Sequence, residues 1–373
     1  MTEIDSLITR AALQSEIFLQ SHVSQSNGGQ GAISGAFALH TGQSMPDLYG
    51  MVDAVYILYI IGRLGERTDR ASRRTWAERI LSCQDEEGWF SERNLRGHSR
   101  EHATAYAIGA LRLLEIEPDE AHVNRLRPLA GLLPLLTEHG TFRRWIARLG
   151  FRIALDDVPG NLGWNYVWRS SHVAGGVAAA VGMTKHLFSS WWGGRVDVSR
   201  WLDWFFEWLD AHINPKTGYW QRALWNLVYR KPNVIDLGGA AHFFWIYQAS
   251  GRPFPYPEQT IRSTLAVQKE TGLYRSYPMC IDLDGNFCLT RSFAQLSRER
   301  QGLYRESVHR ALDANFIGIV DALTAKPLTE IYSDLHGLPG ALTALVECGK
   351  LPGFRFADAI EDWRNPFDRA WWL

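Results

Sequence analysis

The sequence predicts an all-α protein: a single (α/α)6 toroid, in which six pairs of inner and outer helices close into a ring. Three observations predict this fold. Segments rich in small and apolar residues recur at helical spacing along the chain, a short Asp-Leu-x-Gly start repeats, and alternating apolar and polar runs of strand length are scarce. The chain of 373 residues also exceeds the roughly 250–300 residues of a usual single core, which favours a closed array of repeats.

Inner helices are predicted where a repeated start precedes a segment of small residues. In the last of these segments, Leu338, Leu342 and Leu345 share one helical face. Small residues on the other faces are typical of a helix that is packed on all sides, as an inner ring requires. The starts are predicted at Asp47, His98, Ser171, Asp236, Asp282 and Asp334.

Outer helices are predicted from amphipathic segments, such as the one in which Trp201, Phe205 and Trp208 share a side. Turns with Gly followed by aromatic residues, as at Gly88 and Gly218, connect them to the inner helices. The segments 139–168 and 214–235 are predicted to be long loops. We expect one domain over residues 1–373, with the tail 354–373 packed on the ring. The predicted outer helices are 68–82, 119–136, 198–212, 257–269 and 304–323, with 4–20 leading in.

The composition excludes several classes of function. Hydrophobic residues make up 46% and charged residues 21% of the chain, and the net charge is -1 without a basic stripe, so we expect no nucleic-acid partner. The longest apolar run, 55–61, is far shorter than the ~20 residues of a membrane span, and the first residues lack the apolar core of a signal peptide. We therefore expect a cytoplasmic protein. The 16 Trp residues suit a small-molecule or oligosaccharide substrate, either an isoprenoid or a sugar.

One repeat carries a resemblance to a known superfamily. The turn Gln84-Asp-Glu-Glu-Gly88-Trp-Phe is followed by His102-Ala-Thr104-Ala-Tyr106-Ala. Together they resemble a repeat of the terpenoid cyclases and protein prenyltransferase β-subunits, which combine a Gln-x-x-x-Gly-aromatic turn with an inner helix that begins with a His-Thr-Tyr-Ala pattern. The resemblance implies a toroid of six helix pairs with the active site in its central funnel.

The segment 278–286 resembles two different sites of that superfamily. It is similar to the Asp-x-Asp-Asp stretch of class II terpene cyclases, which implies that Asp284 is a protonating acid, although Gly285 replaces the third Asp. It is also similar to the zinc repeats of protein prenyltransferases, where Asp284 and His336 would match two ligands. Asn286 replaces the expected Cys ligand, so we expect no metal and no cofactor. The four Cys residues contain no Cys-x-x-Cys pair and predict neither a zinc finger nor a disulfide framework.

The candidate catalytic residues are acids and histidines near the starts of the inner helices. Asp284 lies two residues from Asp282, and repulsion between two carboxylates raises the pKa of one of them, as a general acid requires. Histidines at the same rim are candidate bases. The alternatives are helix capping for each Asp and a structural role for each His. The predicted catalytic set is Asp284, Asp282, His336, Asp236, His102 and His172.

The candidate substrate-binding residues are predicted at the same rim. Trp side chains are candidates for the wall of the site, with core packing as the alternative. Arg169 and Arg291 enter inner helices and are candidates to hold a carboxylate or a diphosphate, with ion pairs to rim Asp residues as the alternative. The predicted set is Asp47, Asp334, Trp164, Trp168, Arg169, Trp220, His242, Trp245 and Arg291.

Three functions are compatible with these residues. The first is an isoprenoid-handling enzyme such as a cyclase, in which Asp284 protonates the substrate and His336 or His102 removes the final proton. The second is a carbohydrate-active lyase, hydrolase or epimerase, with Trp residues that stack on sugars and paired Asp residues that act as acid and base. The third is a non-catalytic binding ring. An apolar funnel with one deep acid would favour the first, and a site with many polar side chains would favour the second.

Overall fold

The chain is all-helical over the residues that the structure describes. The computed structural model describes residues 3–24, 34–91, 98–151, 166–220 and 231–373. Within these ranges the only β-type pairing consists of isolated bridges between single residues, so the all-α prediction is confirmed. In the same ranges, no helix combines the length and the apolar character that a membrane crossing requires.

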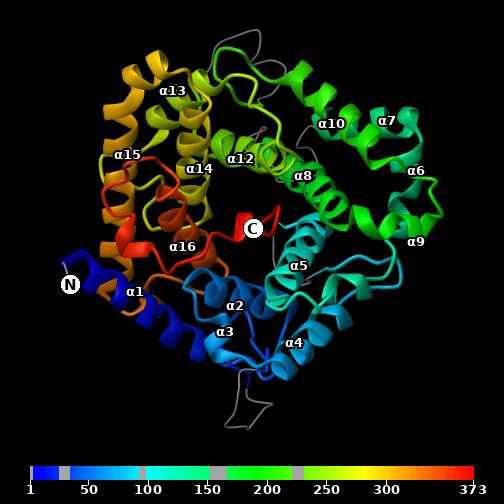
Figure 1. Cartoon of the computed structure of the whole chain (residues 1–373), viewed down its shortest axis with the longest axis horizontal. Helices are drawn as coiled ribbons and strands as arrows, with labels where there is room; N and C mark the ends of the chain where they lie inside the picture. The colour runs from blue at the N-terminus through cyan, green and yellow to red at the C-terminus, as the bar shows by residue number, and fades with distance from the viewer. Residues whose placement is uncertain (1–2, 25–33, 92–97, 152–165, 221–230) are drawn as a thin grey trace, which may run out of the picture.

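Within the described ranges, six helices form the inner layer of the molecule. Each of them contacts the next in chain order, and the last contacts the first, so that they surround a common centre (Figure 1). Glycines bring neighbouring helices close together: a Cβ on Gly340 would lie 2.4 Å from Cα of Cys280, and a Cβ on Gly176 would lie 2.7 Å from the backbone of Glu101. The ring helices are α2 (Leu48–Ile60), α5 (Arg100–Leu114), α8 (Tyr166–Thr184), α12 (Val234–Ala249), α14 (Cys280–Ala294) and α16 (Gly337–Cys348).

A second layer of helices packs outside the ring helices. Here α4 contacts α2 and α5, α7 and α10 contact α8, and α13 and α15 contact α14. Their inner faces are apolar; on α10 the buried side chains Trp201, Phe205 and Leu209 follow the helical repeat. The outer helices are α1 (Glu3–Gln20), α4 (Arg70–Ser82), α7 (His139–Phe151), α10 (Val198–His212), α13 (Pro257–Val267) and α15 (Arg298–Ala325).

Short helices fill the connections between these long ones. The α-helical pieces are α3 (Leu64–Arg67), α6 (Leu133–Thr137) and α9 (Phe188–Trp192). The 3-10 turns are η1 (His122–Arg125), η2 (Ala130–Leu132), η3 (Lys185–Leu187), η4 (Leu328–Glu330), η5 (Asp358–Ile360) and η6 (Pro366–Asp368).

Two of the predicted elements between α5 and α8 are wrong. The expected outer helix at 119–136 is broken into η1, η2 and α6, because Pro128 and Pro134 lack the N–H that a continuous helix needs. The expected loop at 139–168 begins instead with helix α7. Phe142, Ile146 and Leu149 are buried at helical spacing there, a pattern that predicts an amphipathic helix.

The turns after α4 and α13 share one construction. Nε2 of Gln84 donates to the carbonyls of Gly88 and Arg127 at 2.7 and 3.0 Å. Nε2 of Gln268 donates in the same way to Gly272 and Ala311, at 2.7 and 2.8 Å. In both cases the second acceptor lies 43 residues after the Gln. Equal geometry at an equal spacing indicates an internal repeat.

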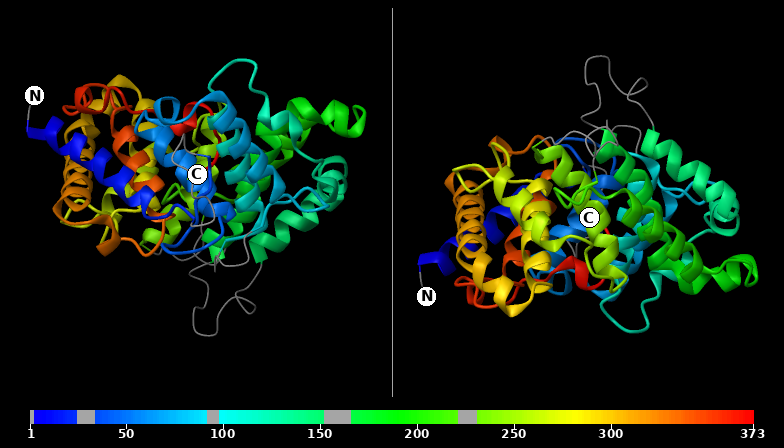
Figure 2. Two further views of the ribbon diagram at one scale, coloured as in Figure 1. Left: turned by 90° about the horizontal axis from the view of Figure 1, so that it is seen from below. Right: turned by 90° about the horizontal axis from the view of Figure 1, so that it is seen from above.

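The last residues of the chain lie inside the ring. The end of the chain is in the middle of the molecule in all three ribbon views (Figure 1, Figure 2). The hydroxyl of Tyr56 on α2 donates to the carbonyl of Trp372 at 2.6 Å. Gly175 and Gly182 on α8 make room for two rings, since a Cβ on either would lie within 3 Å of the ring of Trp372 or Trp371. Trp372 thereby fills the space between the ring helices.

Candidate functional site

Five histidine side chains meet at the centre of the ring. The ring centroids of His98 and His102 are 4.4 Å apart, and those of His102 and His172 are 4.6 Å apart. The ring of His242 lies 4.7 Å from His172, and that of His336 lies 4.7 Å from His98. We call these five residues the histidine cluster. They reach the centre from four ring helices, or from the residues just before them, although they are spread over more than two hundred residues of sequence.

Backbone hydrogen bonds at the starts of two ring helices place His98, His102 and His336. The N-cap of α5 is Ser99, whose hydroxyl accepts a bond from the backbone N–H of His102 at 3.2 Å. Ser99 thus fixes the turn that separates His98 from His102. Similarly, the Asp334 carboxylate accepts a bond from the backbone N–H of His336 at 3.0 Å, directly before α16 begins.

A buried carboxylate holds the ring of His336. Nδ1 of His336 lies 3.0 Å from Oδ1 of Asp53, and the hydroxyl of Tyr106 donates to the same oxygen at 2.6 Å. Asp53 is fully buried in α2, whereas 23% of the His336 side chain is exposed. When Nδ1 carries the proton toward Asp53, Nε2 of the neutral ring is left as an acceptor. This arrangement suits a general base.

The other members of the cluster are only partly satisfied. Nδ1 of His102 lies 3.1 Å from the hydroxyl of Tyr49, and Nδ1 of His242 lies 2.8 Å from the hydroxyl of Ser171. Nδ1 of His98 and Nδ1 of His172 are buried without a hydrogen-bond partner among the described residues. Buried polar atoms are normally paired, so these two nitrogens mark a place where a ligand can bind.

Burial keeps most of the cluster uncharged. It lowers the pKa values of His98, His102 and His172 well below the usual range, and charge repulsion between neighbouring imidazoles lowers them further. Burial also lowers the pKa of His242 to about 3. His336 differs: burial lowers its pKa, but the attraction of Asp53 and the hydrogen bond to it outweigh burial and raise the pKa overall.

Two of the predicted rim aspartates, Asp47 and Asp236, take part in helix capping. Oδ1 of Asp47 accepts from the backbone N–H of Gly50 at 2.8 Å, and Oδ2 accepts from Leu39 at 2.9 Å. Asp236 takes part in a capping box with Asn233 at the start of α12. Asp334 accepts from the backbone N–H of His336, but the N-cap of α16 is His336, whose side chain makes no capping hydrogen bond. For Asp47 and Asp236 the structure shows the capping alternative.

Asp282 and Asp284 have different surroundings. Asp282 accepts bonds from the backbone of Tyr274 and Met279 at 3.1 and 3.0 Å and from Nδ2 of Asn315 at 2.8 Å. Asp284 is 2% exposed, and its Oδ1 has no hydrogen-bond partner among the described residues. Burial, together with the charge of Asp282, raises the pKa of Asp284 well above its usual range. Burial and the neighbouring carboxylate therefore favour the neutral form of Asp284.

The predicted binding residues fall into two groups. Trp168 lies beside the cluster, with its ring 5.6 Å from that of His172, and Arg169 is close enough to lower the pKa of His172. The other group is structural: Arg291 pairs with buried Glu347 at 2.6 Å. Trp220 donates its indole N–H to Leu209 at 2.8 Å.

Trp245 also lies beside the cluster, with its ring 4.8 Å from that of His242. It is buried against Trp372, with ring centroids 5.3 Å apart. Trp164, the last of the predicted binding residues, lies outside the described residues.

Several residues of the centre are not in the predicted sets. Among them are Tyr49, Asp53, His98 and Tyr106. His98 had a sequence signal, since it stands four residues before His102 and so shares a side with it. Asp53 had one too, because it is the only charged residue in the apolar helix α2.

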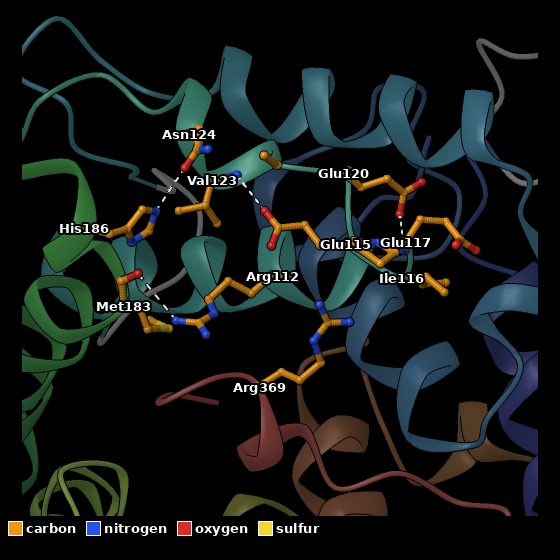
Figure 3. A pocket seen from close by; sticks show the side chains of 12 residues that line it. Arg112, Glu115, Ile116, Glu117, Glu120, Val123, Asn124, Met183, His186 and Arg369 are labelled. Atoms are coloured by element: carbon orange, nitrogen blue, oxygen red, sulfur yellow. Dashed lines mark hydrogen bonds between the residues drawn. The ribbon is translucent and has the colours of Figure 1, made fainter. Parts of the chain in front are cut away.

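A separate hollow lies at the other ends of α5 and α8. It has a volume of about 520 Å³ and contains Arg112, Glu115, Met183, His186 and Arg369 among its lining residues (Figure 3). Arg112 donates weakly to the carbonyl of Met183 at 3.4 Å. None of the predicted site residues lines this hollow, so it is distinct from the histidine cluster.

Comparison of the chain with protein-family models, with curated proteins and with solved structures finds no match. Function is therefore inferred from the geometry of the site.

Proposed function

We propose that this chain is an enzyme built on an (α/α)6 toroid and that it moves protons on a polar, carbohydrate-like substrate at the centre of the ring. His336 is the base, and Asp53 orients it. The observation that carries the proposal is the contact between these two residues: a fully buried carboxylate 3.0 Å from Nδ1 of an imidazole that is itself partly exposed.

Two features support the toroid. The six ring helices contact one another in a closed cycle. The matched turns at Gln84 and Gln268 repeat one construction in two helix pairs, as a toroid of repeated pairs requires. The Gln84 turn is also the segment that resembles the terpenoid cyclase and prenyltransferase superfamily.

The proposed proton transfer follows from the orientation of His336. Nδ1–H donates to Asp53, and Nε2 takes a proton from an acidic C–H or O–H of the substrate. The imidazolium that forms is stabilised by the Asp53 carboxylate, to which Tyr106 also donates. At an acidic C–H, the electron pair of the broken bond stays on the substrate, where it takes up a new proton, as in epimerisation, or expels the oxygen substituent on the next carbon, as in elimination. The proton on Nε2 passes to that substituent or to water, which restores the neutral ring.

The lining of the centre favours a polar substrate. The rings of Tyr49 and His98 lie beside His336. Arg169 lies close to His172. Such side chains pair with hydroxyl and carboxylate groups, whereas a hydrocarbon chain would leave them unsatisfied. Trp168, beside His172, supplies an aromatic face of the kind on which sugar rings pack. A uronic acid oligosaccharide combines these groups, and its acidic C–H is a substrate for a His base.

A second candidate function is protonation of an isoprenoid. One observation favours it: Asp284 is a buried carboxylic acid whose pKa is raised well above its usual range, first by burial and then by Asp282. A carboxyl group that stays protonated at neutral pH can deliver a proton to an alkene. In this case Asp284, and not His336, would start the reaction.

Product analysis separates the two functions. Wild type, His336→Gln and Asp284→Asn are each incubated with uronate oligosaccharides and, separately, with polyprenyl diphosphates. The proposal predicts turnover of the uronate substrate that falls at least ~100-fold in His336→Gln and persists in Asp284→Asn. If wild type turns over the polyprenyl diphosphate and Asp284→Asn does not, the second function is correct and the first is wrong. Binding without turnover of either substrate would contradict both.

A further inference from the structure

We propose that His98, His102 and His172 together bind one divalent transition-metal ion, with zinc as the reference ion. This inference goes beyond the proposed function, because it concerns a ligand that the proton transfer at His336 does not require. It also departs from the sequence-based expectation of no metal.

The positions of the three side chains carry the proposal. One ligand nitrogen from each residue lies within 4.8 Å of those of the other two. Nitrogens on a tetrahedral zinc, with bonds of about 2.0–2.1 Å, lie about 3.4 Å apart, so small side-chain rotations bring the three to bonding distance. His98 and His102 come from the start of α5, and His172 comes from the neighbouring helix α8.

The second, independent observation is that two buried ring nitrogens have no hydrogen-bond partner among the described residues. Nδ1 of His172 is buried without a partner on a residue that is only 4% exposed, and Nδ1 of His98 is also buried and unpaired. His102 is different, because Tyr49 holds its Nδ1 at 3.1 Å and leaves Nε2 for the cluster. A group that fixes the far nitrogen of a metal-binding His is a common feature of metal sites.

The chemistry of the donors narrows the class of ion. Three neutral imidazoles suit Zn²⁺, Co²⁺, Ni²⁺, Cu²⁺ or Fe²⁺, and they do not suit Mg²⁺ or Ca²⁺, which prefer oxygen ligands. Three protein ligands also leave a fourth position free for water or substrate, as in catalytic metal sites. The ring of His336 lies 4.7 Å from that of His98, on the edge of the site.

This site differs from the zinc position of the prenyltransferase repeat. Nδ2 of Asn286, which replaces the expected Cys, donates to Asn315 at 2.8 Å and to the carbonyl of Ala344 at 3.0 Å. Asn286 is fully buried in this network. The proposed ion is bound in a different part of the ring, by residues from α5 and α8.

Metal titration of the whole chain tests the proposal. The protein is stripped with a chelator, and Zn²⁺ is titrated against a competing indicator dye. Co²⁺ is added in a parallel titration and followed by visible absorption. We expect one ion of either metal per chain and a Co²⁺ spectrum with the intense bands of four- or five-coordinate geometry.

Variants identify the ligands. His98→Gln and His172→Gln are each expected to abolish stoichiometric binding, and Tyr49→Phe is expected to weaken it roughly 10–100-fold because it removes the support of His102. The matched control is His122→Gln, a change at a histidine on η1 that is also buried, at 5% exposure, and should bind like wild type. Circular dichroism of each variant checks that it is folded.

Two results would overturn the proposal. One is that the wild-type protein binds neither Zn²⁺ nor Co²⁺ beyond what the dye alone binds. This result can be interpreted without any variant. The other is binding that persists in folded His98→Gln and His172→Gln. Neither result depends on turnover of a substrate, so failure here is distinguishable from failure of the proposed reaction.

Discussion

Nδ1 of His336 lies 3.0 Å from Oδ1 of Asp53, although 283 residues separate the two in sequence. The contact joins the last ring helix to the first, since His336 immediately precedes α16 and Asp53 lies in α2. It therefore closes the ring at the point where the proposed base stands. Both the architecture and the chemistry depend on this pair.

The hydroxyl of Tyr106 should contribute to stability through Asp53. Tyr106→Phe removes the 2.6 Å bond to a fully buried carboxylate, and we expect it to lower the free energy of unfolding by about 1–3 kcal/mol. Tyr274→Phe is the matched control, because the buried hydroxyl of Tyr274 has no hydrogen-bond partner among the described residues. Urea unfolding of both variants measures the difference. Equal losses of unfolding free energy in the two variants would show that the hydrogen bond to Asp53 does not stabilise the protein.

The buried acid Asp284 should make stability fall as the pH rises. Its pKa is raised in the folded state by burial and by Asp282, from an ordinary value of 3.8. The neutral form is thus favoured in the folded protein, and this contribution is complete below pH 3.8 and is lost as the pH rises through the folded pKa. The nearest titratable groups are Asp282, Cys280 and Cys288 on the same helix.

Asp284→Asn should abolish that dependence. The amide is neutral at every pH, so we expect the variant to gain stability relative to wild type progressively as the pH rises above 3.8, until the folded pKa of Asp284 has been passed. Urea unfolding in a series of buffers across this range measures the gap in unfolding free energy between Asp284→Asn and wild type. A gap that stays constant with pH would show that Asp284 titrates in the folded protein as an ordinary carboxylate.

Arg291 should act on stability and not on substrate binding. It pairs with Glu347, which is fully buried. Arg291→Ala leaves that carboxylate with hydrogen bonds from Thr290 and Asn365 but without its cationic partner, and is expected to cost about 3–5 kcal/mol of unfolding free energy. Arg74→Ala breaks an exposed pair with Glu78 and should cost less than ~1 kcal/mol. A variant at Arg291 with wild-type stability and a raised KM would restore the role in substrate binding that the sequence suggests.

Gly88 should be intolerant of any side chain. Its φ is +88°, and a Cβ there would lie 2.2 Å from the carbonyl oxygen of Pro128. Gly42 has a similar φ of +80° but no atom within 4 Å of the added Cβ, so Gly42→Ala costs only the backbone strain, about 1–2 kcal/mol. We expect Gly88→Ala to cost roughly 1–3 kcal/mol more, as overpacking does. Thermal unfolding compares the two, and equal losses would contradict the tight turn.

Helix starts could be predicted from the sequence because capping is a local effect. Asp47 caps α2 through Gly50, only three residues away, and the apolar stripe of α10 is visible in its own fifteen residues. The centre of the ring could not be predicted in the same way. His336 and Asp53 meet only when the ring closes, and nothing in either segment alone specifies that contact. Histidines from separate repeats gather for the same reason.

Some of the wrong predictions concern features that the local sequence pattern does indicate. The helix α7 has Phe142 and Ile146 at helical spacing, within the segment 139–168 predicted to be a loop. Asp47 and Asp236 take part in helix capping and Asp334 binds the backbone just before a helix, so the repeated Asp-Leu-x-Gly start identifies where helices begin. It does not by itself identify chemistry.

The rate of Asp53→Asn with uronate oligosaccharides tests the proposed chemistry most directly. The amide can donate to Nδ1 of His336, which moves the ring proton to Nε2 and removes the base. We predict that kcat falls by roughly 10²–10⁴-fold in a folded variant while KM changes little. A folded Asp53→Asn protein that turns over this substrate at the wild-type rate would contradict the assignment of His336 as the base.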